Sequence, residues 1–177
     1  MLGKLATYLR MCGHDAAYAL DRGVEADDRL RVLADREDRR LLTRDEALAD
    51  RTPGAILLTE RAVTDQLREL DAAGVDLRLA ARPARCGRCN GPVELAAEPS
   101  DASPDSTDLP DTPDPSDTPD PPNGPTDSAD TSDSPDRDRP EYVPGDVRAW
   151  RCLDCGQWFW KGSHWDRVAE TLAAVRE

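Results

Sequence analysis

Two short stretches decide the organisation of this chain, Cys86-Gly87-Arg88-Cys89 and Cys152-Leu153-Asp154-Cys155. Each is a Cys-x-x-Cys step, in which two intervening residues let both sulfurs face one point. Two such steps supply four thiolates, which complete a tetrahedral shell for a structural zinc ion. Residues that tolerate a positive φ follow each step, Asn90-Gly91 after the first and Gly156 after the second. A tight turn that leads into a hairpin has this requirement.

The spacing between the two steps supports a zinc ribbon once a low-complexity segment is set aside. The two steps are separated by 62 residues, of which 45 belong to the segment 97–141. The remaining 17 residues fall inside the interval of about 15–20 that is typical of four-cysteine zinc sites. Two disulfides and a redox dithiol are the alternatives. Disulfides need an oxidising compartment, and a redox motif needs no second cysteine pair.

Residues 97–141 contain 12 Asp, 12 Ser or Thr and 11 Pro, with almost nothing to bury. Such a segment cannot offset the entropy cost of ordering, and we predict a disordered insert. Its net charge is −12, whereas the whole chain carries −13. The rest of the chain is therefore nearly neutral, and the acidity does not exclude a nucleic-acid partner. Mimicry of RNA or a role as a partner-binding tail is the alternative to a tolerated loop.

The composition and motifs limit where the protein can be located and which catalytic mechanisms it can use. No stretch reaches the roughly 18 apolar residues that a membrane span needs, and the N-terminus lacks the pattern of a signal peptide. We therefore expect a soluble cytoplasmic protein. The sequence contains no glycine-rich phosphate loop and no Ser/His/Asp arrangement. Cys12 is left over, and we interpret it as a small buried apolar residue.

Apolar periodicity outside the cysteine steps predicts short strands that alternate with helices. The pattern predicts helices over 2–12, from Asp27, from Asp45, over 62–73 and from Ser163 to Val175, and strands over 16–20, 41–43, 55–59 and 75–79. Asp27, Asp45 and Ser163 are the expected N-caps. Such alternation indicates an α/β fold, a parallel sheet with helices on its faces. The chain opens on a helix, so we expect this sheet to lack its first strand.

Four aspartates are the best candidates for catalysis. Asp45 follows the strand at 41–43 with one residue between, Asp27 and Asp28 follow the apolar run at 16–20, and Asp15 precedes it. Active groups gather beyond the carboxyl ends of strands in an open parallel sheet. Carboxylates that meet there would hold Mg²⁺ or Mn²⁺, which activates water and stabilises charge on a phosphate. The alternative for each residue is structural, because helix N-caps prefer Asp.

The aromatic residues are concentrated beside the second cysteine pair. All four Trp and the only Phe lie within residues 150–165. Strand alternation predicts that Trp158 and Trp160 share one face and that Phe159 lies on the other. Aromatics with neighbouring cations could stack on RNA bases, or they could cover the zinc turns. The candidate RNA contacts are Lys4, Arg44, Lys161, His164 and Trp165.

Taken together, these motifs resemble those of the mutator-seven C-terminal RNase family, a PIN-like nuclease domain followed by a zinc ribbon. The matching pieces are Met1-Leu2-Gly3-Lys4-Leu5-Ala6, Tyr8-Leu9-Arg10, Gly13-His14-Asp15, Asp27-Asp28, Leu41-Leu42-Thr43-Arg44-Asp45, Gln66-Leu67, both cysteine pairs and Trp160-Lys161-Gly162-Ser163-His164-Trp165. The resemblance covers both parts that are expected to fold and skips the acidic insert.

The resemblance implies a PIN-like domain over 1–82, a zinc ribbon over 83–165 interrupted by the insert, and a C-terminal helix over 163–177. It implies a metal-dependent endoribonuclease that uses Asp45, then Asp27 or Asp28, then Asp15. Family members also carry a strand that ends in a metal-ligating Asp before the Met-Leu-Gly run, so we expect weak or no activity from a protein that begins at Met1. The alternative function is a non-catalytic adaptor that binds RNA or a protein partner through the ribbon.

Overall fold

A computed structural model describes residues 2–98 and 139–176 of the chain. Most of the predicted insert lies outside the described residues. The described helices are α1 (Gly3–Met11), the short 3-10 helix η1 (Ala19–Arg22), α2 (Asp27–Arg36), α3 (Glu46–Asp50), α4 (Val63–Ala72) and α5 (Ser163–Val175). The described strands are β1 (Leu42–Thr43), β2 (Ile56–Leu57), β3 (Val93–Ala97), β4 (Ala149–Cys152) and β5 (Trp158–Trp160). None of the described helices has the length and apolar character that a membrane span requires.

The N-terminal part contains a small parallel sheet. β1 pairs with β2, so that Leu42 lies opposite Ile56 and Thr43 opposite Leu57, and α3 connects the two strands. The predicted strands at 41–43 and 55–59 are therefore confirmed, with shorter bounds. The mixture of helices, a parallel sheet and a separate antiparallel sheet confirms the α/β class in this coarser sense.

Two predicted strands are wrong. Residues 16–20 run into η1, which ends at Gly23 in the left-handed region (φ 64°), and no strand forms there. Residues 75–79 form neither a helix nor a strand, although Leu77 is buried, and they pair with no strand among the described residues. Leu77 belongs to the hydrophobic cluster of α1, α4 and α5, and Ala16, Val75 and Leu79 pack against it. Alternating apolar residues report which side of a segment is buried, and the same pattern arises whether or not its backbone joins a sheet.

The predicted helices occur within one or two residues of their expected bounds. In α1, Leu5 and Leu9 are buried, and in α4, Leu67 and Leu70 are buried, as helical spacing predicts. Asp45 caps α3 as predicted, because its Oδ1 accepts a hydrogen bond from the Leu48 backbone N–H at 2.8 Å.

Two other predicted caps are wrong. Asp27 and Ser163 are the first residues of their helices, and neither helix has a side-chain cap. The Asp27 carboxylate contacts Arg51 at 3.1 Å instead.

The C-terminal part contains the antiparallel sheet β3-β4-β5. Its register places Leu95 opposite Trp150, and Trp150 opposite Phe159. Trp158 and Trp160 pack together with Ala149 on the other face, so the predicted alternation of the aromatics is confirmed. Ala97, which we assigned to the insert, instead ends β3 and is only 3% exposed.

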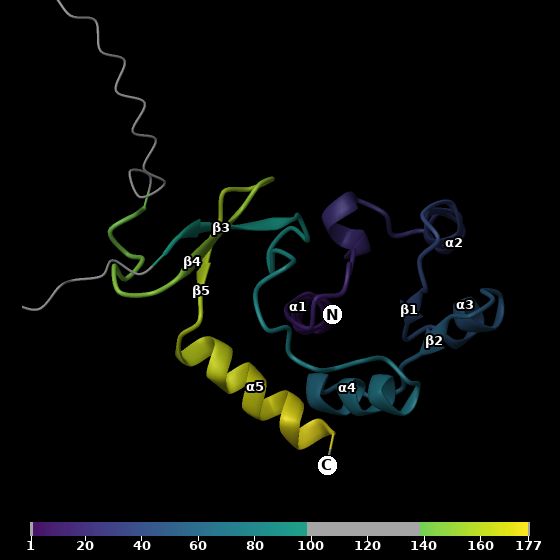
Figure 1. Ribbon diagram of the computed structural model, residues 1–177. Helices are drawn as coiled ribbons and strands as arrows, with labels where there is room; N and C mark the ends of the chain where they lie inside the picture. The colour runs from purple at the N-terminus through teal and green to yellow at the C-terminus, as the bar shows by residue number, and fades with distance from the viewer. Residues whose placement is uncertain (1, 99–138, 177) are drawn as a thin grey trace, which may run out of the picture.

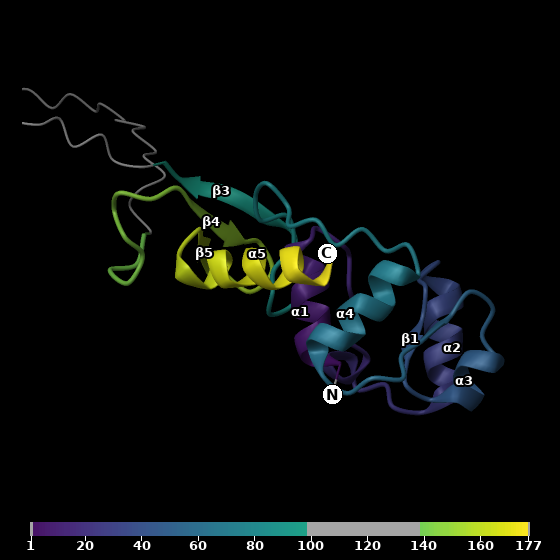
Figure 2. The same ribbon diagram turned by 90° about the horizontal axis from the view of Figure 1, so that it is seen from below.

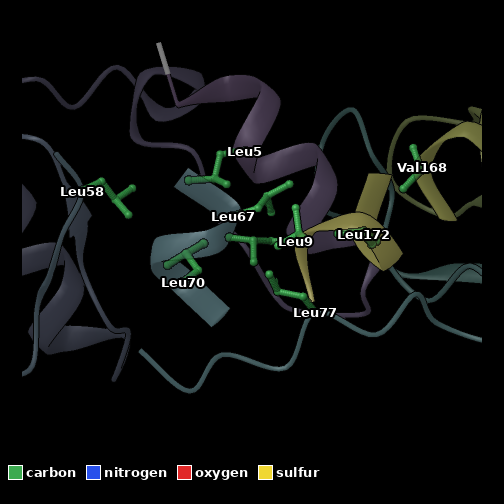
Figure 3. Close-up of a cluster of buried hydrophobic side chains, with 9 residues drawn as sticks. Leu5, Leu9, Leu58, Leu67, Leu70, Leu77, Val168 and Leu172 are labelled. Atoms are coloured by element: carbon green, nitrogen blue, oxygen red, sulfur yellow. The ribbon is translucent and has the colours of Figure 1, made fainter. Parts of the chain in front are cut away.

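The C-terminal helix returns to the N-terminal part. In Figures 1 and 2, α5 leaves the antiparallel sheet and lies beside α4. Val168, Leu172 and Val175 of α5 join the hydrophobic cluster of α1 and α4, which Figure 3 shows around Leu9 and Leu67. One core therefore contains residues from both ends of the chain.

This packing predicts a large cost for truncating Leu172, which is 1% exposed. We expect Leu172→Ala to lower the free energy of unfolding by about 2–5 kcal/mol, because it removes transfer energy and leaves a cavity. Leu20→Ala, at a residue that is 50% exposed, is the control and should cost far less. Urea denaturation of both variants checks this. A small effect at Leu172 would show that α5 is not part of the core.

Candidate metal centre and surrounding charged residues

The four predicted zinc ligands meet at one point. The sulfur atoms of Cys86, Cys89, Cys152 and Cys155 all lie within 4.8 Å of one another. The Cys86–Cys155 pair is 3.6 Å apart and the Cys89–Cys152 pair 3.5 Å. A tetrahedral zinc site with Zn–S distances of about 2.3 Å has sulfur–sulfur edges of about 3.8 Å. The cysteines are free and these separations far exceed a disulfide bond, so the donor set and its spacing fit zinc.

The first cysteine pair lies in a tight turn that aims amide hydrogens at the sulfurs. The backbone N–H groups of Cys89 and Gly91 point at the sulfurs of Cys86 and Cys89, at 3.5 and 3.4 Å. Asn90 has a φ of 71°, as predicted from its residue type. Gly91 packs against the Asp154 side chain so closely that any Cβ would collide with it. A larger residue here would therefore displace the exposed Asp154 side chain.

The second cysteine pair repeats the geometry of the first. Gly156 has a φ of 70°, and its N–H donates to the Cys152 carbonyl at 3.0 Å. The Cys152 N–H in turn donates to the carbonyl of Gln157 at 2.9 Å. In the first turn the corresponding bonds are 2.9 and 2.8 Å long. Two matching turns face each other, as a closed four-ligand structural site requires.

The thiols differ in acidity before a metal binds. Desolvation raises the pKa of Cys86, and it raises the pKa of Cys89 to about 12. Desolvation also acts on Cys155, but hydrogen bonds from the Gln157 backbone N–H and from the neighbouring thiols outweigh it and lower that pKa to about 7. A cation that binds here must displace the remaining protons, so its affinity falls as the pH falls.

A buried arginine attaches the first zinc turn to α1. Arg10 is 3% exposed, and its Nη1 donates to the carbonyls of Gly87 and Arg88 at 3.0 and 3.1 Å. These are the two residues between the cysteines of the first pair. Arg10 Nε donates to the Ala16 carbonyl at 2.8 Å, and Nη2 lies 3.7 Å from Asp21. A buried guanidinium is tolerated when such groups satisfy its donors. The sequence motifs include Arg10 but predict no role for it, because bonds to distant carbonyls leave no local pattern.

Asp15 forms a second link to the same turn. Its carboxylate receives two hydrogen bonds from Arg39, at 2.9 and 3.2 Å, and one from the Asn90 side chain at 2.5 Å. Arg85 lies 3.4 Å away. The hydrogen bond from Arg39 is the main cause that holds the pKa of Asp15 below its usual value, with Asn90 adding to it. Asn90 also accepts the backbone N–H of Ala16 at 3.0 Å.

The other three candidate acids lie apart from the cysteines. Asp45 is exposed at the start of α3, Asp27 pairs with Arg51, and Asp28, with a side chain 86% exposed, lies 3.7 Å from Arg31. Within residues 2–98 and 139–176, the cysteines are the one group of three or more potential ligands that comes together. The structure does not bring the four aspartates into one cluster.

The candidate RNA contacts divide between two regions. Lys161 lies over the ring of Trp165, with its Nζ 5.7 Å from the ring centroid, and His164 is exposed in the first turn of α5. Lys4 is exposed on α1, and Arg44 is exposed between β1 and α3. Lys161, His164 and Trp165 form one patch at the start of α5, and Lys4 and Arg44 belong to the N-terminal part.

A cavity of about 960 Å³ lies between α1, α2 and β1. Its apolar lining includes Leu5 and Leu9 of α1, Leu33 of α2, and Leu42 of β1. In the described part of the chain, β2 is the only strand that pairs with β1. The cavity therefore combines an apolar wall with a strand that has one neighbour.

The family model of the Mut7-C RNAse domain matches residues 1–106 and 124–172. The chain belongs to the Mut7-C RNAse domain family. The match includes both cysteine pairs and all four candidate aspartates, and the resemblance found in the motifs is confirmed. Searches of curated proteins and of solved structures gave no significant match. Membership of this family indicates a ribonuclease-type function for which RNA is the substrate class.

The cysteine geometry predicts one bound zinc ion per chain. We expect Cys152→Ser to abolish stoichiometric zinc and to lower the melting temperature strongly, because binding energy in such a site is folding energy. Cys12→Ser is the control: Cys12 lies outside the cluster, and burial is the main cause that raises its pKa to about 11. Metal analysis and thermal melts of both variants check this. Zinc-free wild-type protein, or unchanged melting of Cys152→Ser, would contradict the assignment.

Proposed function

We propose that this chain is a metal-dependent endoribonuclease that hydrolyses RNA phosphodiester bonds, with a structural zinc ribbon that aids RNA binding. Membership of the Mut7-C RNAse family, over both parts of the chain, is the observation that carries this proposal. We retain the division into a nuclease part over 1–82, a ribbon over 83–165 and a helix over 163–177. Free cysteines are consistent with a reducing, cytoplasmic location.

Asp45 is our first candidate for the catalytic acid. It is exposed directly after β1, and one carboxylate oxygen caps α3. Within residues 2–98 and 139–176, its side chain makes no hydrogen bond or ion pair beyond that cap. Asp27 or Asp28 is our second candidate and Asp15 our third. Mg²⁺ or Mn²⁺ held by such carboxylates would supply an activated water and stabilise charge on the phosphate.

The described carboxylates alone do not complete a metal site. Asp15 and Asp27 are paired with arginines, and the four acids are not clustered. We propose that β1 belongs to a larger PIN-like sheet, in which a further strand lies along its second edge. The cavity beside β1 supports this, because an added apolar strand would fill it and gain a pairing partner. The family resemblance implies that such a strand ends in a metal-ligating Asp.

The cap and ion-pair contacts of these acids also favour a second candidate function. If the aspartates serve only as caps and ion-pair partners, the chain is a non-catalytic adaptor that binds RNA through its ribbon. Asp15 bridges Arg39 and Asn90, which is a structural role in its own right. The two functions differ in one outcome, namely whether bound RNA is cut.

Substitution of Asp45 separates the two functions. Asn caps a helix about as well as Asp but is a poor ligand for Mg²⁺. We therefore expect the free energy of unfolding of Asp45→Asn to lie within about 0.5 kcal/mol of the wild-type value. We expect it to cleave a labelled single-stranded RNA at least ~100-fold more slowly with Mn²⁺, because even outer-shell partners of a metal contribute 10–100-fold. Asp50→Asn, at an exposed acid of the same helix, is the control.

The assay is run with Mn²⁺ and again with EDTA, and we expect cleavage only with the metal. Cleavage by Asp45→Asn at the wild-type rate would refute the role of this residue. Binding of RNA without cleavage would favour the adaptor.

A further inference from the structure

One face of the antiparallel sheet forms a pocket that carries positive charge. The pocket has a volume of about 520 Å³. Leu95 of β3 and Trp150 of β4 line its floor, together with Val147. Three cations line it as well, Arg82 before the first cysteine pair, Arg148 before β4 and Lys161 after β5.

The register of the sheet explains why these residues meet. Leu95 lies opposite Trp150, so both project from the same face. Arg148 lies two residues before Trp150, and Lys161 lies two residues after Phe159, which pairs with Trp150. A period of two therefore directs both cations to the face that carries Leu95 and Trp150.

The two faces of the sheet differ in what covers them. On the opposite face, Ala149 and Trp158 pack with Val143 in a buried cluster. On the pocket face, Leu95 remains 50% exposed although it lies in the middle of β3. Trp150 is only 6% exposed, so it supplies a rigid floor.

The charged residues that line the pocket are all positive. None of the described residues that line it is acidic. Arg148 does have an acidic partner outside the lining, because the Glu98 carboxylate accepts a hydrogen bond from it at 2.8 Å. Both side chains of this pair are more than half exposed, so the pair is weak and a competing anion could replace Glu98. Outside the acidic segment the chain is almost neutral, which makes three cations at one pocket a distinct feature.

We infer that this pocket binds a nucleotide of single-stranded RNA, with backbone phosphate on Arg82, Arg148 and Lys161 and the base or ribose on the apolar floor. Cations that track a backbone beside apolar surface are the usual elements of single-strand binding. Lys161 would connect the pocket with the patch of His164 and Trp165, because it also lies over the Trp165 ring. The inference rests on the proposed function, since it names where on the ribbon the RNA substrate class binds.

The test measures RNA affinity by fluorescence polarisation with a labelled twelve-nucleotide oligouridine. Zinc-loaded protein is used without added Mg²⁺ or Mn²⁺, so that binding is measured apart from cleavage. We expect Arg148→Gln and Arg82→Gln each to weaken binding several-fold. Each should also lower the slope of log K against log salt by about 0.7, the value for one phosphate contact to a single strand. We expect Glu98→Gln to tighten binding, because it releases Arg148.

Arg29→Gln is the matched control, because Arg29 is an exposed arginine on α2 and does not line the pocket. The zinc content of every variant is measured, so that a folding defect is not read as a binding defect. Wild-type affinity in Arg148→Gln with full zinc, or an equal loss in Arg29→Gln, would overturn the inference. Binding of a labelled oligo-aspartate peptide, without binding of the RNA, would also overturn the inference. If the RNA binds this pocket and is never cleaved with Mn²⁺, the nuclease proposal fails and the pocket assignment stands.

Discussion

The structure depends on the four-sulfur cluster, which holds together two turns that are far apart in the sequence. The turns at Cys86–Cys89 and at Cys152–Cys155 are separated by 62 residues, and their sulfurs lie within 4.8 Å of one another. A three-stranded sheet with little apolar surface cannot maintain this approach by burial alone, whereas zinc binding contributes directly to folding. The ion expected there therefore fixes the pairing of β3 with β4, and through β4 the position of β5.

The cysteine cluster is also tied to the N-terminal part by two routes. The first turn is held by Arg10, which donates to the two carbonyls between Cys86 and Cys89, and by Asn90, which bonds to Asp15 and Ala16. The second route follows β5 into α5, whose Leu172 lies in the core with α1 and α4. The antiparallel sheet is thus an integral part of one structure, and a change at the cysteine cluster should reach α1.

The sequence predicted the features that depend on local spacing. Two Cys-x-x-Cys steps and their following turns identified the metal site, and helical periodicity located α1 and α4. Asp45 was identified as a cap because its position before a helix is a local signal. The strands at 16–20 and 75–79 were predicted wrongly, because apolar alternation reports burial and strand pairing needs a partner elsewhere in the chain. The bonds of Arg10 to Gly87 and Arg88, and of Asp15 to Asn90, were not predictable for the same reason: these partners lie more than 70 residues away.

Hydrogen exchange measured by mass spectrometry, on the zinc-loaded protein and on protein treated with a chelator, tests the central claim most directly. We expect removal of zinc to abolish protection in β3, β4 and β5 and also to increase exchange clearly in α5 and at the end of α1 around Arg10. An increase confined to the three strands, with α1 and α5 unchanged, would contradict the claim that the metal site supports the whole structure.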